Sequence, residues 1–78
     1  MKRESDRYLD LAHALRELRT AAGLTQTELA SALDKPQSYV SKYESGERRL
    51  DLVELETLAR ALGLTLSQVT QHFEESSQ

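Results

Sequence analysis

The sequence predicts an all-α fold of five short helices without a sheet. No segment alternates apolar and polar residues as a half-buried strand does. Apolar residues recur instead three and four positions apart, which places them on one face of a helix. Three glycines and a single proline divide the chain into segments of helical length. We therefore expect a compact bundle in which these residues mark the helix boundaries.

The first predicted helix ends at Gly23. Leu11, Leu15 and Leu18 stand at positions i, i+4 and i+7, and Tyr8 extends the same apolar face toward the N-terminus. Glycine commonly follows the last residue of a helix, since it adopts a left-handed conformation at little steric cost. We expect residues 1–4 and 75–78, at the two ends of the chain, to be frayed.

The second predicted helix starts with a capping box. The hydroxyl of Thr25 is expected to accept a hydrogen bond from the backbone N–H of Glu28, and the Glu28 carboxylate to accept one from the N–H of Thr25. Leu29, Ala30 and Leu33 then form one apolar stripe. The pattern predicts a short helix that is anchored at its first residue.

Pro36 separates this helix from a third one. Proline lacks the N–H that continues a helix and disfavours helical geometry in the residue before it, yet it is well tolerated at a helix start. A new helix can therefore begin at Gln37 and direct Val40 and Tyr43 inward. Residues 25–44 thus predict a helix-turn-helix, whose second helix is suited to the major groove of DNA.

Two further helices are predicted after residue 50. One ends at Gly63, and its apolar positions are Leu52, Leu55, Leu58, Ala59 and Leu62. We interpret the leucines as core residues, because so small a chain needs most of its apolar side chains to be buried. Either Thr65 or Ser67 can cap the last helix.

The last helix carries more apolar surface than one side of a small bundle covers easily. Leu66, Val69 and Phe73 lie on this helix, which is too short to be stable alone. We interpret these three side chains as a dimer contact, with ordinary packing inside one chain as the alternative.

The order and spacing of these segments resemble the Cro/phage-repressor (lambda-repressor-like) helix-turn-helix domains. The likeness extends from about residue 11 to about residue 73, and it is carried by residues 15–19, 23–26, 28–30, 37–46 and 58–63. It implies a single domain over residues 1–78, with a core at about 7–74 and a helix-turn-helix at about 25–44. The chain departs from the family pattern at Asp34, where glycine is usual. Aspartate tolerates the positive φ that such a turn needs better than most residues do.

The outward face of the third helix is the candidate base-reading surface. At about 100° per residue, Gln37, Ser38, Ser41 and Lys42 fall on the side opposite the apolar residues. Glutamine can bond adenine through two hydrogen bonds, and lysine can reach guanine. By resemblance, Gln37, Ser38 and Lys42 match the positions that contact bases. The alternative is a helix face that is simply solvated.

Five residues around this helix are candidate phosphate contacts. Gln26 and Thr27 open the preceding helix, where free N–H groups attract anions. The hydroxyl of Tyr39 and the cations Arg48 and Arg49 can also meet the DNA backbone. For the two arginines, the alternative is an ordinary surface role.

The resemblance also implies an ion pair between Arg19 and Glu44. In the family, residues at these positions tie the first helix to the end of the recognition helix. Arg19 lies one turn before Gly23, and Glu44 lies on the inward side of its helix, so the contact is geometrically feasible. The alternative is two separate surface charges.

Composition limits the kind of protein further. The absence of cysteine excludes disulfides. His13 and His72 are far apart in sequence and have no neighbouring ligand set, so we expect no metal and no cofactor. No apolar run approaches the roughly 18 residues of a membrane span, and no signal-type stretch follows Met1. We therefore expect a cytoplasmic protein without a membrane partner.

Charge is distributed unevenly along the chain. The formal net charge of −3 argues against indiscriminate binding to nucleic acid. Residues 35–49 contain four basic and two acidic side chains, whereas residues 50–78 contain one basic and five acidic ones. This polarity suits a protein that presents one face to DNA.

The resemblance implies a sequence-specific transcriptional regulator, bacterial or phage in origin. We expect a homodimeric repressor or controller that binds a palindromic, double-stranded DNA operator through the helix starting near Gln37. No nucleophile with a paired base and no glycine-rich phosphate loop is present, so we do not expect an enzyme. No part of the chain is evident as a sensor of a small-molecule effector. The alternative is an antitoxin-type interaction module whose main partner is a toxin protein.

Overall fold

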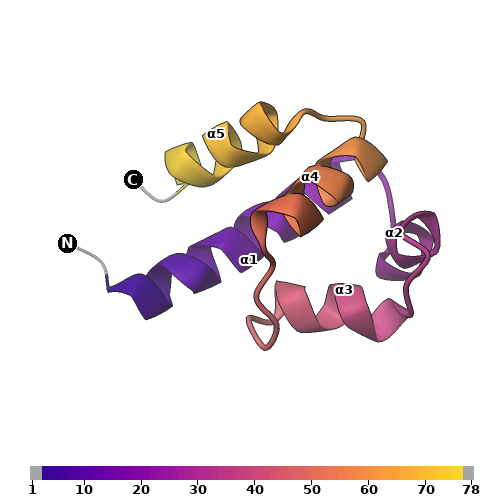
Figure 1. Ribbon diagram of the computed structural model, residues 1–78, viewed down its shortest axis with the longest axis horizontal. Coiled ribbons are helices and arrows are strands. Elements are labelled where there is room, and N and C mark those ends of the chain that lie inside the picture. The colour runs from indigo at the N-terminus through magenta and orange to yellow at the C-terminus, as the bar shows by residue number, and fades with distance from the viewer. Residues whose placement is uncertain (1–2, 77–78) are drawn as a thin grey trace.

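The computed structural model describes residues 3–76, and within this range the chain forms five α-helices and no strand (Figure 1). The helices are α1 (Glu4–Ala21), α2 (Gln26–Ala32), α3 (Gln37–Glu44), α4 (Leu52–Ala61) and α5 (Leu66–Ser76). The predicted all-α, five-helix fold is confirmed.

Helix α1 is the longest element, and it lies between α5 and α3 (Figure 1). Helices α2 and α3 pack against each other, α3 also contacts α1, and α5 packs on both α1 and α4. Helix α3 therefore lies at one outer edge of the molecule, and α5 lies at the opposite edge (Figure 1). This arrangement leaves the outer side of α3 open.

Local sequence signals set the boundaries of the helix-turn-helix. The Thr25 Oγ1 atom accepts a hydrogen bond from the N–H of Glu28 at 3.0 Å, and a Glu28 carboxylate oxygen accepts one from the N–H of Thr25 at 2.9 Å. Pro36 is the residue that precedes α3. Asp34 has a φ of 57°, so it occupies the left-handed conformation expected of this turn position.

Two further capping boxes start α4 and α5. The Asp51 carboxylate accepts a hydrogen bond from the N–H of Glu54 at 2.7 Å, and the Glu54 carboxylate accepts one from the N–H of Asp51 at 2.9 Å. Thr65 and Gln68 form the same arrangement at 3.1 and 2.9 Å. Thr65, rather than Ser67, therefore caps the last helix.

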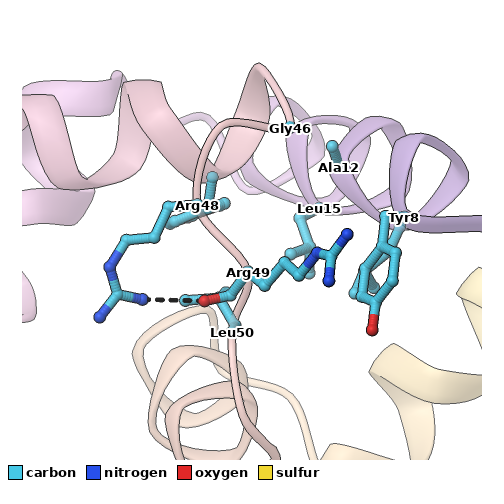
Figure 2. Close-up of a pocket in the computed structure, with 9 residues that line it drawn as sticks. Tyr8, Ala12, Leu15, Gly46, Arg48, Arg49 and Leu50 are labelled. Atoms are coloured by element: carbon cyan, nitrogen blue, oxygen red, sulfur yellow. Dashed lines mark hydrogen bonds between the residues drawn. The ribbon is translucent and has the colours of Figure 1, made fainter. Parts of the chain in front are cut away.

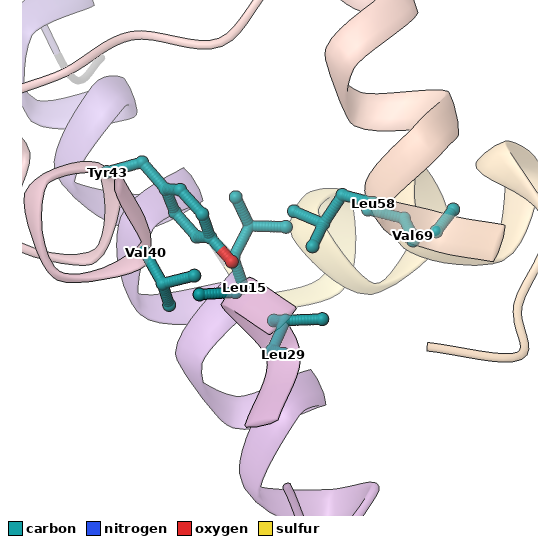
Figure 3. Close-up of a cluster of buried hydrophobic side chains, with 8 residues drawn as sticks. Leu15, Leu29, Val40, Tyr43, Leu58 and Val69 are labelled. Carbon is teal, nitrogen blue, oxygen red and sulfur yellow. The ribbon is translucent and has the colours of Figure 1, made fainter. Parts of the chain in front are cut away.

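All five helices contribute side chains to the hydrophobic core (Figure 3). Its buried members are Leu15, Leu29, Ala30, Val40, Tyr43, Leu58, Ala59 and Val69. The expectation that the leucines are core residues is wrong for Leu9 and Leu52, which are 47% and 65% exposed. Leu52 lies in the first turn of α4, and its neighbour Val53 is 71% exposed. The beginning of α4 therefore protrudes beyond the part of the helix that the core covers.

The helices extend further toward the termini than predicted. Helix α1 already starts at Glu4, and α5 continues to Ser76, so the expected fraying is wrong for these ends. The carbonyl of Arg3 accepts the N–H groups of Asp6 and Arg7, which stabilises the first turn. Residues 1–2 and 77–78, which were also expected to be frayed, lie outside the described residues.

The three side chains predicted as a dimer contact differ in their surroundings. Val69 is 1% exposed and belongs to the core of its own chain. Its assignment to a dimer contact is therefore corrected, because a partner cannot reach it in this packing. Leu66 and Phe73 are half-buried, and the guanidinium of Arg7 lies 4.1 Å from the centre of the Phe73 ring.

Candidate nucleic-acid interface

Helix α3 presents a polar outer face and an apolar inner face. Gln37, Ser38 and Lys42 are exposed, whereas Val40 and Tyr43 are buried in the core. The predicted orientation of the helix is therefore correct for these residues. Ser41, the fourth candidate base-reading residue, is half-buried and lies at the edge of the exposed face.

Arg19 and Glu44 form a buried ion pair between the end of α1 and the end of α3. Arg19 Nε donates to Glu44 Oε2 at 2.7 Å, and Arg19 Nη2 donates to Glu44 Oε1 at 3.0 Å. Arg19 Nη1 also donates to the carbonyl of Leu24 at 2.8 Å. Both residues are 8% exposed. The hydrogen bonds that Arg19 donates to Glu44 raise the pKa of Arg19 despite the opposing effect of burial.

A chain of hydrogen bonds leads from this ion pair to the surface of α3. Gln26 Nε2 donates to Glu44 Oε1 at 3.1 Å, and Gln37 Nε2 donates to Gln26 Oε1 at 2.7 Å. An ionised carboxylate only accepts hydrogen bonds, so the amide nitrogen of Gln26 must face Glu44 and its oxygen must face Gln37. The same reasoning fixes the amide of Gln37, since only its nitrogen can donate to that oxygen.

These hydrogen bonds give the side-chain amide of Gln37 a defined orientation. Its amide oxygen and one remaining N–H are left for a ligand, which is the donor and acceptor pair that adenine requires in the major groove. The prediction from sequence treated Gln26 as a phosphate contact and overlooked this bridging role. The sequence does contain a signal for this role, because a glutamine opens each of the two helices that a helix-turn-helix brings together.

Two of the predicted phosphate contacts meet at Glu54, which the sequence did not suggest as a site residue. Arg48 Nη2 donates to Glu54 Oε2 at 2.9 Å, and the Tyr39 hydroxyl lies 3.4 Å from the same oxygen. The Arg48 guanidinium also lies 4.7 Å from the centre of the Tyr39 ring. The hydrogen bond between Arg48 and Glu54 raises the pKa of Arg48 and lowers the pKa of Glu54. Burial raises the pKa of Tyr39.

Arg48 and Arg49 leave the loop between α3 and α4 in opposite directions (Figure 2). The Arg49 guanidinium lies 4.0 Å from the centre of the Tyr8 ring. The hollow around them has a volume of about 10 Å³, which is at most the space of one water molecule. Thr27, the remaining candidate, is exposed in the first turn of α2. The structure thus keeps Arg48 and Arg49 apart rather than in one cationic cluster.

The remaining titratable groups form no further site. His72 Nε2 lies 3.3 Å from a carboxylate oxygen of Glu17, while His13 is exposed elsewhere on α1. Within residues 3–76, no group of His, Asp and Glu side chains has the arrangement of a metal site. None of the helices in this range is long and apolar enough to cross a membrane.

Helices α2 and α3 pack against each other across a short turn, and α3 has a polar outer face. This arrangement defines a DNA-binding domain of the helix-turn-helix class. Residues 15–69 match the helix-turn-helix family, so the chain belongs to that family. It is a DNA-binding transcriptional regulator of the Cro/phage-repressor type.

Individual relatives agree with this assignment. The chain is 32% identical over 72 residues to the control protein C.MunI from Mycoplasma, covering 91% of this chain and 97% of that protein. An XRE-family-like protein from Pseudomonas syringae is 42% identical, with a TM-score of 0.80 over 94% of this chain and 89% of that one. The restriction-modification controller C.AhdI from Aeromonas hydrophila is 39% identical, with a TM-score of 0.74 over 80% of this chain and 94% of that one.

Proposed function

We propose that the protein is a homodimeric repressor or controller that binds a palindromic DNA operator through the outer face of α3. The observation that carries this proposal is the hydrogen bond from Gln37 to Gln26, which orients the Gln37 amide and leaves its oxygen and one N–H outside the protein's own hydrogen-bond chain. A surface glutamine without such a hydrogen bond would lose side-chain conformational entropy when it binds DNA. Its pre-orientation favours recognition of a base over a merely solvated surface.

Base contacts come from the exposed side chains of α3. Gln37 accepts a hydrogen bond from N6 of adenine and donates to N7. Ser38 can bond either kind of partner, and Lys42 reaches O6 or N7 of guanine. Ser41 contributes from the edge, because it is half-buried.

Phosphate contacts frame this surface on both sides. Thr27 offers an exposed hydroxyl at the start of α2, and Gln26 keeps one amide hydrogen beyond its contact with Glu44. Tyr39 and Arg48, which meet at Glu54, serve the DNA backbone on the other side, and Arg49 serves it from the opposite side of their loop (Figure 2). These contacts set the position of the protein on the duplex, and the bases set its sequence preference.

A homodimer meets the need for two recognition helices. One helix reads only a few base pairs, so two helices about 34 Å apart are required to read two half-sites in successive major grooves. Leu52 and Val53 are exposed at the start of α4, and Leu66 and Phe73 on α5 retain part of their surface. We propose that the dimer contact draws on these residues, without Val69. A strictly monomeric species by light scattering at high micromolar concentration would count against the dimer.

Selection of bound sequences from a pool of random duplexes tests the function itself. We expect recovered sites with two inverted half-sites whose centres lie about 10 base pairs apart. Recovery of no common sequence would contradict a sequence-specific regulator. The likeness to two proteins named as control proteins supports a controller over an antitoxin whose main partner is a toxin.

A further inference from the structure

Glu54 holds two groups that the proposed function assigns to DNA phosphates. One carboxylate oxygen, Oε2, accepts from Arg48 Nη2 at 2.9 Å and lies 3.4 Å from the Tyr39 hydroxyl. The other oxygen, Oε1, accepts from the N–H of Asp51 at 2.9 Å and belongs to the capping box of α4. A phosphate oxygen is the same kind of acceptor, anionic and able to take several hydrogen bonds.

We propose that the Glu54 carboxylate stands in for a DNA phosphate between Arg48 and Tyr39 in the free protein, and that DNA binding replaces it. This inference rests on the proposed function. Glu54 then acts as a built-in competitor that sets the affinity for the DNA backbone. Glu54 should not change the sequence preference of the protein, because phosphates carry no sequence information.

The exchange is feasible because the ion pair is accessible. The side chains of Arg48 and Glu54 are 39% and 28% exposed, and ion pairs at such positions are weak. The ring of Tyr39 stays beneath the Arg48 guanidinium and can hold its plane when the carboxylate leaves. Lys35 Nζ lies 5.5 Å from the centre of the same ring, and Lys35 lines the same surface hollow as Tyr39 and Glu54, so a second cation borders this place.

A different role for Glu54 predicts the opposite result. If Glu54 positioned Arg48 for DNA, loss of its charge would weaken binding. If it competes with phosphate, loss of its charge frees Arg48 and removes a like charge near the DNA backbone, so binding becomes tighter. The sign of the change in affinity therefore separates the two roles.

The test substitution is Glu54→Gln. Glutamine can still complete a capping box at this position, so α4 is expected to remain intact, which a thermal melt verifies. With a duplex that the parent protein selected from random sequences, we expect Kd to fall about two- to fivefold, the range that a weak, exposed ion pair allows. Because Arg48 meets a phosphate in the complex of either protein, the slope of log K against log salt concentration should change by clearly less than about 0.9, the value of one whole phosphate contact. A random duplex should show the same gain.

Glu56→Gln is the matched control. Glu56 is on the same helix and carries the same charge, but it lies 3.8 Å from Arg60 and not beside Arg48. We expect a clearly smaller effect from this substitution. In an Arg48→Ala background, Glu54→Gln should lose most of its gain, because its main partner is absent.

Three results would overturn the inference. Unchanged or weaker binding by Glu54→Gln would exclude competition, and an equal gain from Glu56→Gln would reduce the effect to net charge. A full gain in the Arg48→Ala background would also contradict it. Each of these leaves the proposed function intact if the parent binds its selected DNA. Absence of any DNA binding by the parent would overturn both.

Discussion

Arg19 and Glu44 lie 25 residues apart in sequence and meet through two nearly parallel hydrogen bonds of 2.7 and 3.0 Å in a buried site. The pair fixes the end of the recognition helix to the end of α1. It also determines what Gln26 and Gln37 can do, since Glu44 Oε1 accepts a hydrogen bond from Gln26 as well. One structural ion pair thus supports both the fold and the geometry of the candidate base-reading surface.

Removal of either partner of this pair is expected to be severely destabilising. Arg19→Ala or Glu44→Ala leaves a buried charge without its partner, which costs roughly 3–5 kcal/mol and is enough to unfold a small domain. A double Arg19→Met, Glu44→Leu variant should lose much less, because no unpaired charge remains. Thermal melts compare the three. Single variants that melt within a degree of the parent would show that the pair contributes little.

Gln26→Ala is expected to weaken specific binding although Gln26 reads no base in the proposed complex. The substitution removes the acceptor that orients Gln37, so Gln37 must be ordered when DNA binds. We expect a loss of about 1 kcal/mol on the selected duplex and a smaller loss on random DNA. Gln71→Ala, at an exposed position of α5, serves as a control remote from α3. Equal losses of affinity on the selected and the random duplex would indicate that Gln26 only contacts a phosphate, and would contradict its role in orienting Gln37.

Tyr43→Phe is expected to stabilise the fold. The Tyr43 hydroxyl is buried and has no hydrogen-bond partner within residues 3–76. Removing such a group while keeping the ring should raise the free energy of unfolding by about 1–2 kcal/mol, as measured by chemical denaturation. A loss of stability would show that the hydroxyl is satisfied in solution.

The same residue predicts alkaline sensitivity. Burial raises the pKa of Tyr43 above its ordinary value of about 10. The unfolded chain therefore releases this proton at a lower pH than the folded one, and stability falls as the pH rises above about 10. Tyr43→Phe should lose less stability than the parent between about pH 9 and 11.5, by the same denaturation experiment. If stability fell equally with pH in both proteins, the Tyr43 hydroxyl would not be the source of the alkaline sensitivity.

Acid sensitivity is expected from two capping carboxylates. The Thr25 N–H lowers the pKa of Glu28, and Arg48 and then the Asp51 N–H lower the pKa of Glu54. Both folded-state pKa values lie below that of an unfolded glutamate, about 4.3. Their stabilisation is therefore present at neutral pH and is lost as the pH falls below about 4. Melts at decreasing pH should show a shallower decline for a Glu28→Gln, Glu54→Gln variant; an unchanged slope would exclude these groups.

Local signals made most of the fold predictable. The Thr25 capping box, Pro36 and the left-handed Asp34 are decided by residues close in sequence, so the helix-turn-helix could be located from sequence alone. The exposure of Leu52 and the burial of Val69 depend on which helices cover α4 and α5. Periodicity identifies an apolar face but does not say how far the neighbouring helices extend over it.

The candidate site was predictable for the outer face of α3, because helical geometry fixes which residues share a side. The role of Gln26 and the participation of Glu54 were not. Gln26 contacts residues 11 and 18 positions away in sequence, and Arg48 and Tyr39 meet Glu54 across two different helices and a loop. Such contacts depend on the tertiary packing of α2, α3 and α4.

The most direct test of the base-reading role of Gln37 measures the DNA affinity of Gln37→Ala and of Arg49→Ala. The DNAs are the selected duplex and a set of duplexes in which each half-site position is replaced, one at a time, by each of the other base pairs. Gln37→Ala should cost about 1–3 kcal/mol and relax the preference at one base pair. Arg49→Ala should weaken all sequences alike and reduce the salt slope by about 1. If Gln37→Ala bound every duplex as the parent does, with the same preference at each position, α3 would not be reading DNA through this residue.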